Sequence, residues 1–104
     1  MPDTAMNHMT IQMNAILINK EDNVATAIME LSQGAQAKFW AHDEIVEILI
    51  KERIPQYHKF AVRDIRKMEL VRKYGEVIGQ ALCDISQGSH VHVHNIESPG
   101  RSRS

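Results

Sequence analysis

Three histidines alternate with two valines near the end of the chain, in the run His90-Val91-His92-Val93-His94-Asn95. Side chains alternate between the two faces of a strand, so an extended run places the imidazoles on one face and the valines on the other. Imidazole binds metals through a ring nitrogen and transfers protons near neutral pH. The outer histidines would lie about 13 Å apart at the usual rise of a strand. The pattern therefore predicts a metal or ligand site that uses at most two neighbouring histidines.

His92 and His94 are the best candidates for metal binding, substrate contact and proton transfer. His90 ranks lower because it directly follows the turn expected at residues 88–89. The alternative is a half-buried strand whose solvated face carries polar residues without a ligand. No CxxC, HExxH or second His/Cys pair supports a closed zinc site. The single cysteine, Cys83, provides no disulfide framework and is expected to be buried as a small apolar residue.

Four further side chains would suit an acidic substrate. His58 follows a turn and precedes a strand, a position from which a side chain can reach a cleft; the alternative is a histidine in a surface loop. Lys59 and Lys73 could each pair with a carboxylate, although a lone lysine is more often a solvated charge. The planar fork of Arg63 would bind a carboxylate if it faced a cleft, and otherwise faces solvent or pairs locally.

Length and composition limit the class of protein. A chain of 104 residues allows one compact domain with a modest core, which favours an active site completed by a partner. The 12 basic and 13 acidic residues give a net charge of −1, without the clustered positive face of a nucleic-acid-binding protein. No segment is long and apolar enough to span a membrane, and no secretory signal is visible. A cytoplasmic location is predicted.

Short strand-like runs alternate with turn signals over most of the chain, which predicts a small, mainly β domain. Strands are expected at residues 15–18, 23–29, 35–40, 44–50, 59–63, 77–83 and 89–95. The apolar residues of 44–52 also fit a helix, but their β-branched side chains favour a strand. Residues 1–13 and 97–104 lack periodicity and are expected to be a flexible segment and a disordered tail around a domain at 14–96.

A five-residue pattern recurs at the expected turns: an acid, an aliphatic residue, two variable residues and glycine. It occupies residues 30–34 and 84–88, with a degraded copy at 64–68. The aliphatic residue would enter the core, and the glycine would adopt a positive φ. Asp64 and Asp84 are expected to accept hydrogen bonds from nearby backbone N–H groups. Short strands joined by such turns predict a folded-over β-barrel or clip.

Several of these segments, taken in order, resemble the SAF domain of the altronate/galactarate dehydratase family. The segments are His58-Lys59-Phe60-Ala61-Val62-Arg63-Asp64-Ile65, Lys73-Tyr74-Gly75-Glu76-Val77-Ile78-Gly79, and Asp84-Ile85 through Gly88 to the histidine run. With a weaker similarity at 23–31, the match covers about residues 14–96. The resemblance implies a β-clip fold beside a much larger catalytic domain. Some relatives carry the two parts as separate polypeptides, including the small subunit of sulfolactate sulfo-lyase.

The resemblance implies that the chain is such a small subunit. It would complete the active site of a large subunit that removes water from a sugar acid such as altronate or galactarate; the alternative reaction removes sulfite from (2R)-sulfolactate. The family also implies a divalent metal, Fe²⁺ or Mg²⁺, held mainly by the large subunit or by His92 and His94. The expected catalytic residues are His92, His94 and His58, and the expected substrate-binding residues are Lys59, Arg63 and Lys73.

Two other functions stay open: a stand-alone SAF module that binds its ligand alone, and a metal-storage or metal-delivery protein with too few ligands to be favoured. Exposed strand edges would also allow a homodimer or trimer. Three positions depart from the family pattern, with Arg53 where an acid is usual and Tyr57 and Met68 where glycine is usual. These changes are expected to affect local turns and to leave the fold intact.

Overall fold

The computed structural model describes residues 12–99, which form nine short strands and contain no helix. The strands are β1 (Ala15–Ile16), β2 (Val24–Ala27), β3 (Gln36–Ala41), β4 (Glu44–Leu49), β5 (Lys59–Ala61), β6 (Leu70–Lys73), β7 (Glu76–Ala81), β8 (His90–Val91) and β9 (Ile96–Glu97). Within this range, no helix long and apolar enough to cross a membrane occurs. The mainly β fold class is confirmed. The expected flexible segment 1–13 and tail 97–104 fall largely outside the described residues.

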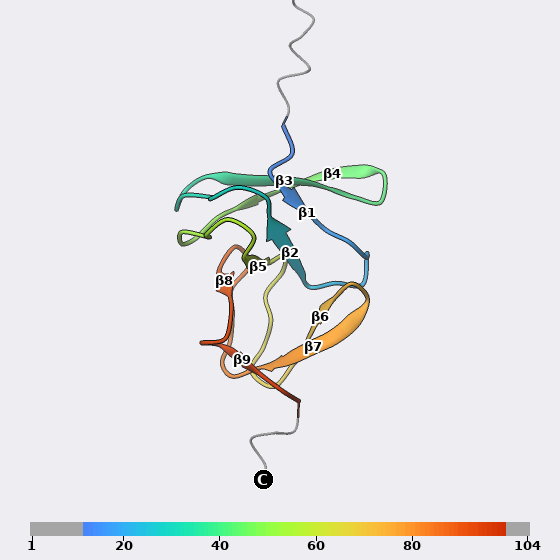
Figure 1. Cartoon of the computed structure of the whole chain (residues 1–104), viewed down its shortest axis with the longest axis vertical. Helices are drawn as coiled ribbons and strands as arrows, with labels where there is room; N and C mark the ends of the chain where they lie inside the picture. The colour runs from blue at the N-terminus through green and yellow to red at the C-terminus, as the bar shows by residue number, and fades with distance from the viewer. Residues whose placement is uncertain (1–11, 100–104) are drawn as a thin grey trace, which may run out of the picture.

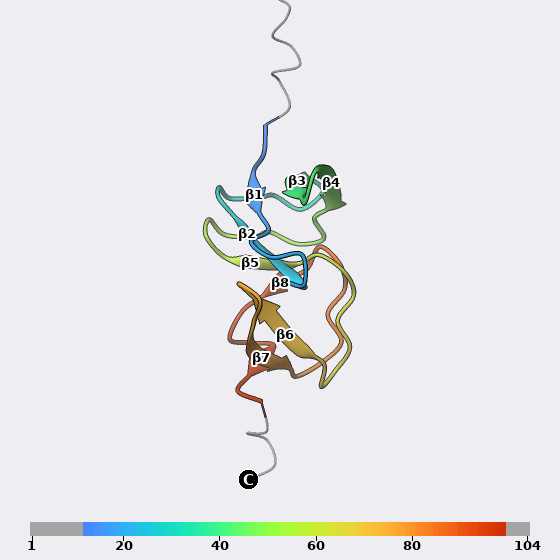
Figure 2. The same ribbon diagram turned by 90° about the vertical axis from the view of Figure 1, so that its right-hand side faces the viewer.

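The strands form three antiparallel sheets that follow one another along the molecule (Figure 1). The β3–β4 hairpin lies across one end, the sheet β6-β7-β9 lies at the other, and the sheet β1-β2-β5-β8 lies between them. Figure 2 shows the same order after a quarter turn. In the central sheet β5 pairs with both β2 and β8, which brings residues 58–60 beside residues 90–91.

Apolar side chains of the described residues are buried in two clusters. The first contains Phe39 and Phe60, whose rings meet edge to face with centroids 6.1 Å apart. The second contains Ile65, Ile85 and smaller residues. Strand β5 contributes to both clusters, because Phe60 belongs to the first and its neighbour Ala61 to the second. The central sheet that carries His90 is thus in contact with both clusters.

The five-residue turn pattern occurs four times, because residues 53–57 form a further copy with arginine in place of the acid. The aliphatic residues of the copies pair as antiparallel bridges, Leu31 with Ile54 and Ile65 with Ile85. In each bridge the two residues exchange two backbone hydrogen bonds of 2.7–2.9 Å. The four turns therefore form two bonded pairs, one in each half of the domain.

The last residue of every copy has a positive φ, whatever its side chain. The φ angles are 90° at Gly34, 68° at Tyr57, 77° at Met68 and 88° at Gly88. Tyr57 and Met68 therefore keep the backbone conformation of the glycines that they replace. A side chain in this left-handed region is strained by contact with its own backbone.

Asp64 and Asp84 accept hydrogen bonds from backbone N–H groups, as expected, but the donors belong to the opposite turn and not to their own. Asp64 Oδ1 accepts the Gln87 N–H at 2.9 Å, and Asp84 Oδ1 accepts the Lys67 N–H at 2.8 Å. In the other pair of turns, the arginine substitution produces an ion pair in place of these bonds, with Arg53 Nε 2.8 Å from Glu30 Oε2.

All seven expected strands are present, including the uncertain one at 44–50. Six are shorter than expected, and the strand expected at 35–40 has the same length but is shifted by one residue. Strands β6 and β9 were not expected. The four residues of β6 are two apolar residues followed by two basic ones, and the two residues of β9 are too few to show a period. Cys83 was wrongly expected to be buried; it is exposed, because β7 ends at Ala81 and a turn follows.

Candidate functional site

The histidine run is not one extended strand. Strand β8 ends at Val91, and the chain then turns: the Asn95 N–H donates to the His92 carbonyl oxygen at 3.0 Å. Val91 is fully buried, whereas 77% of Val93 is exposed. The prediction that both valines face one side and all three histidines face the other along a straight strand was therefore wrong. Alternation holds only as far as His92.

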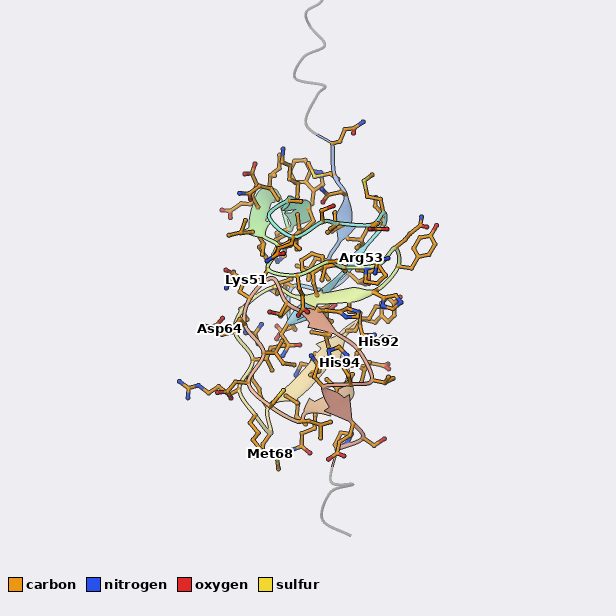
Figure 3. All side chains as sticks on the ribbon, turned by 90° about the vertical axis from the view of Figure 1, so that its left-hand side faces the viewer. Lys51, Arg53, Asp64, Met68, His92 and His94 are labelled. Atoms are coloured by element: carbon orange, nitrogen blue, oxygen red, sulfur yellow. The ribbon has the colours of Figure 1, made fainter. Side chains whose placement is uncertain are left out.

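The turn gathers the imidazoles instead of spacing them. The His90 and His92 rings are nearly parallel, with centroids 5.4 Å apart. His58, from the start of β5, stacks on both of them at 5.0 and 4.4 Å. The His94 ring lies 5.2 Å from that of His90, although an extended strand would hold these residues about 13 Å apart. Figure 3 shows His92 and His94 on the same side of the molecule.

Three of the four histidines form a potential ligand set. His58, His90 and His92 each offer a ring nitrogen, and these atoms all lie within 4.8 Å of one another. His58 Nδ1 lies 2.8 Å from His90 Nε2. His94 is exposed and lies beside this set without belonging to it. The structure thus brings together His58 and His92, two of the expected catalytic residues, and adds His90, which ranked lower in sequence.

Backbone pairing between β5 and β8 holds His58 and His90, two members of the ligand set, in place. In the register of β5 and β8, Phe60 lies opposite His90 and Lys59 opposite Val91. The His58 carbonyl oxygen accepts a hydrogen bond from the Ala27 N–H at 2.9 Å, which attaches the start of β5 to β2. Glu52 accepts the His90 N–H at 3.0 Å. His58 and His90 are therefore held beside each other by the central sheet, whereas His92 lies just beyond the end of β8.

Burial and neighbouring charges lower the pKa of two of the imidazoles, His90 and His92. Burial, followed by the neighbouring His58, His94 and His92, lowers the pKa of His90 to about 4. Burial and the charges of His58, Lys59 and His94 likewise lower the pKa of His92. Neutral imidazole is the form that binds a metal, so these two rings are ready to act as ligands at neutral pH.

The two lysines proposed for substrate binding lie near this cluster. Burial and the charge of Lys73 lower the pKa of Lys59, which itself acts on His92. Both lysines are half-buried, and within residues 12–99 neither forms an ion pair with a carboxylate. Lys73 lies over the ring of Tyr74, with Nζ 4.7 Å from the centroid. Lys59 thus lies close enough to His92 to act on its charge, and Lys73 lies close to Lys59.

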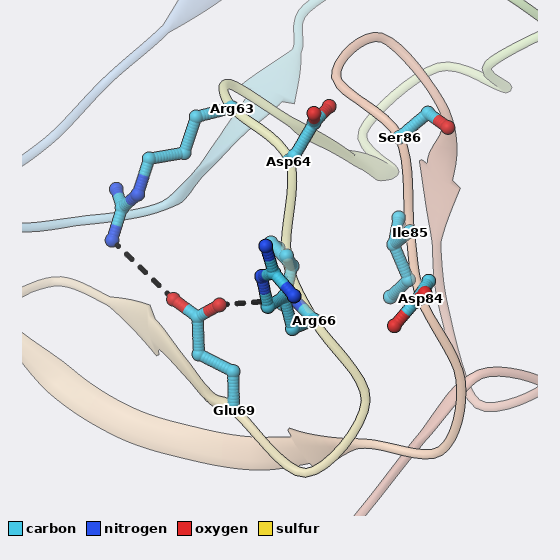
Figure 4. Close-up of a pocket in the computed structure, with 8 residues that line it drawn as sticks. Arg63, Asp64, Arg66, Glu69, Asp84, Ile85 and Ser86 are labelled. Atoms are coloured by element: carbon cyan, nitrogen blue, oxygen red, sulfur yellow. Dashed lines mark hydrogen bonds and ion pairs between the residues drawn. The ribbon is translucent and has the colours of Figure 1, made fainter.

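Arg63, the third residue expected to bind substrate, belongs to a different surface. It lines a polar pocket of about 540 Å³ between two of the turns, together with Asp64, Arg66 and Asp84 (Figure 4). Its guanidinium lies 3.8 Å from the carboxylate of Glu69. No histidine lines this pocket, and Figure 3 shows Asp64 on the opposite side from His92. The structure therefore does not bring Arg63 to the imidazole cluster.

The sequence matches the altronate/galactarate dehydratase SAF domain over residues 13–99. The chain belongs to this family. The SAF domain accounts for all nine strands and for every residue of the imidazole cluster.

Two relatives of this SAF domain are altronate dehydratases, from Bacillus subtilis and Escherichia coli K12, which are 39% and 40% identical to it over 83 residues. Each alignment covers 80% of this chain and only 16% of the relative. A third relative, the (2R)-sulfolactate sulfo-lyase subunit alpha of Chromohalobacter salexigens, is 34% identical over 86 residues. That alignment covers 80% of this chain and 92% of the relative. The SAF domain here thus spans about a sixth of each dehydratase and nearly all of the sulfo-lyase subunit.

Proposed function

We propose that this chain is the small subunit of a lyase and that a separate large subunit carries the rest of the active site. The observation that carries the proposal is the coverage of the relatives: 92% of a protein named as a lyase subunit, against 16% of the dehydratases. The substrate would be a sugar acid such as altronate or galactarate, from which water is eliminated. The second candidate is (2R)-sulfolactate with loss of sulfite, which the coverage of the sulfo-lyase subunit favours.

The imidazole cluster fits a divalent transition metal. Ligand nitrogens lie about 2.0–2.1 Å from such an ion. The three ring nitrogens, which lie within 4.8 Å of one another on stacked rings, would therefore converge on it after the rings reorient. Imidazole suits iron and zinc, whereas Mg²⁺ prefers oxygen ligands. Of the two expected metals, the donor set of His58, His90 and His92 favours Fe²⁺. An ion held there would stabilise the negative charge that develops next to the substrate carboxylate.

Side chains near the ligand set would bind the substrate and transfer the proton. Lys59 and Lys73 would bind the acid group of the substrate, because they are half-buried cations without a carboxylate partner in the described chain. His94 would transfer the proton, since it lies next to the ligand set and remains exposed. His58 and His92, expected to be catalytic, would act as ligands. A cytoplasmic location and homo-oligomeric pairing stay predictions.

Affinity purification of the chain from its own cells, followed by mass spectrometry, tests the subunit assignment. We expect a large polypeptide that resembles the rest of altronate dehydratase, and turnover of a 2-hydroxy acid by the complex only. Release of sulfite from sulfolactate would identify the second candidate reaction. Recovery of the small chain alone, with binding of a sugar acid or metal, would instead indicate a stand-alone module.

Substitutions in the active complex test the site. His94→Gln is expected to lower kcat by at least about 100-fold, the usual contribution of general acid–base catalysis. Lys59→Gln is expected to raise the KM for the acid. Arg63→Gln removes a charge of the same sign from the opposite surface and serves as the matched control. A larger increase in KM for Arg63→Gln than for Lys59→Gln would instead indicate that the substrate binds in the polar pocket lined by Arg63.

A further inference from the structure

We propose that Asn95 is a positioning residue, whose side-chain amide holds His90 and His92 in the arrangement that lets both bind one ion with His58. This inference rests on the proposed metal site. It concerns a residue that touches no ligand itself and acts through the backbone of the two histidines.

Asn95 is buried, and both atoms of its amide are used. Its Oδ1 accepts the His92 N–H at 2.9 Å, and its Nδ2 donates to the His90 carbonyl oxygen at 2.8 Å. Only 7% of the residue is exposed. One side chain therefore contacts the backbone of both histidines and fixes the path of the chain between them.

The backbone of Asn95 fixes the same loop from two further directions. Its N–H donates to the His92 carbonyl oxygen at 3.0 Å, and its carbonyl oxygen accepts the Leu82 N–H at 2.8 Å. The first bond closes the turn, and the second attaches the turn to the chain just after β7. The histidine loop is thus held to the body of the domain and not only to β8.

The geometry of the imidazoles depends on this turn. In a continued strand, His90 and His92 would be about 6.6 Å apart along the chain and His94 the same distance beyond. The bonds from Asn95 end β8 at Val91 and draw the His92 ring against His58, with centroids 4.4 Å apart. The amide donates to one of the two backbone groups through its nitrogen and accepts from the other through its oxygen, which an ionised carboxylate cannot do. Aspartate would place a second acceptor against the His90 carbonyl oxygen.

Asn23 provides a matched control. It is also buried, its Nδ2 donates to the Leu70 carbonyl oxygen at 2.9 Å, and its Oδ1 accepts the Arg72 N–H at 2.8 Å. The amide bonding is therefore the same in kind, but the partners belong to β6 and not to the histidine loop. Substitutions at Asn23 report the cost of losing such an amide without moving the histidines.

The experiment is a titration of the full-length chain with Co²⁺, followed through affinity and through the visible absorption of the bound ion. Asn95→Ala and Asn95→Asp are expected to weaken Co²⁺ binding by about 10–100-fold, as loss of a supporting residue does at metal sites, and to change the band positions. Asn23→Ala is expected to lower the melting temperature and to leave both properties unchanged. Unchanged affinity and spectrum in folded Asn95→Ala would overturn the inference.

Nuclear Overhauser contacts between the rings of His58 and His92 separate this inference from the metal site itself. These contacts are expected in the metal-free wild-type chain and in Asn23→Ala, and to be lost in Asn95→Ala. If the wild type binds no Co²⁺ but the contacts still depend on Asn95, the metal site fails and the positioning role stands. If the contacts persist in Asn95→Ala, the positioning role fails whatever binds.

Discussion

His58 Nδ1 lies 2.8 Å from His90 Nε2, although 32 residues separate the two histidines in sequence. At this distance one nitrogen must carry a hydrogen and the other must accept it, so the two rings hold complementary tautomers. Both rings belong to the set that would bind an ion. A metal bound through either of these two nitrogens would have to replace the hydrogen bond between them.

His92→Gln is expected to weaken metal binding by the isolated chain by at least about 10-fold, because it removes one of three ligands. His94→Gln removes a neighbouring imidazole outside the set and is expected to leave the affinity nearly unchanged. Calorimetric titration with Fe²⁺ under anaerobic conditions, or with Zn²⁺, measures both. A greater loss in His94→Gln would instead support the pairing of His92 with His94 that the linear sequence suggests.

The free energy of unfolding of the metal-free chain is expected to decrease as the pH is lowered through the range in which His90 titrates. Its pKa is about 4 in the folded chain against 6.5 for an unperturbed histidine, chiefly because of burial. Between these values the unfolded chain binds one more proton, so the free energy of unfolding decreases as the pH is lowered from 6.5 to 4.

Urea unfolding at a series of pH values measures this slope. His90→Gln is expected to flatten it, whereas His42→Asn, which removes an exposed histidine at a positive φ of 63°, should not. A slope that is equal in the wild type and in His90→Gln would show that other groups cause the pH dependence.

Two glycines at the same place in the turn pattern are expected to differ in their tolerance of alanine. Gly34 and Gly88 have φ angles of 90° and 88°, so alanine is strained at both by about 1–2 kcal/mol. A Cβ at Gly34 would meet no atom within 4 Å, whereas a Cβ at Gly88 would overlap the carbonyl oxygen of Leu49. Gly88→Ala should therefore cost about 1–3 kcal/mol more than Gly34→Ala in urea unfolding. Equal costs would contradict the close approach of these two backbones.

Met68→Gly is expected to stabilise the protein. Met68 has a φ of 77° and is 47% exposed, so glycine relieves backbone strain at little loss of packing. Relief of about 1–2 kcal/mol against an entropic cost of about 0.5–1 kcal/mol leaves a gain of up to about 1.5 kcal/mol. Lys67→Gly, at an adjacent exposed position without a positive φ, is the control and should destabilise. A lower melting temperature in Met68→Gly would show that its side chain contributes more than its strain costs.

The sequence predicted the fold well because its signals are local. Glycines mark the turns at Gly34 and Gly88, and β-branched residues identify the strand at 44–49. The arrangement of the histidines was harder to predict from the sequence, because His58 meets His90 only through the pairing of β5 with β8. One local signal was present: asparagine directly after His94 favours a turn, and that turn ends the strand.

The two bonded pairs of turns divide the domain into halves, and the imidazoles come from both. His58 follows the turn bridged by Leu31 and Ile54, whereas His90 and His92 follow the turn bridged by Ile65 and Ile85. Neither half contains the complete ligand set. An ion bound there would stabilise the contact between the two halves, since separating the halves would break its coordination. The three histidines of the ligand set, His58, His90 and His92, would then contribute to the stability of the folded domain as well as to its activity.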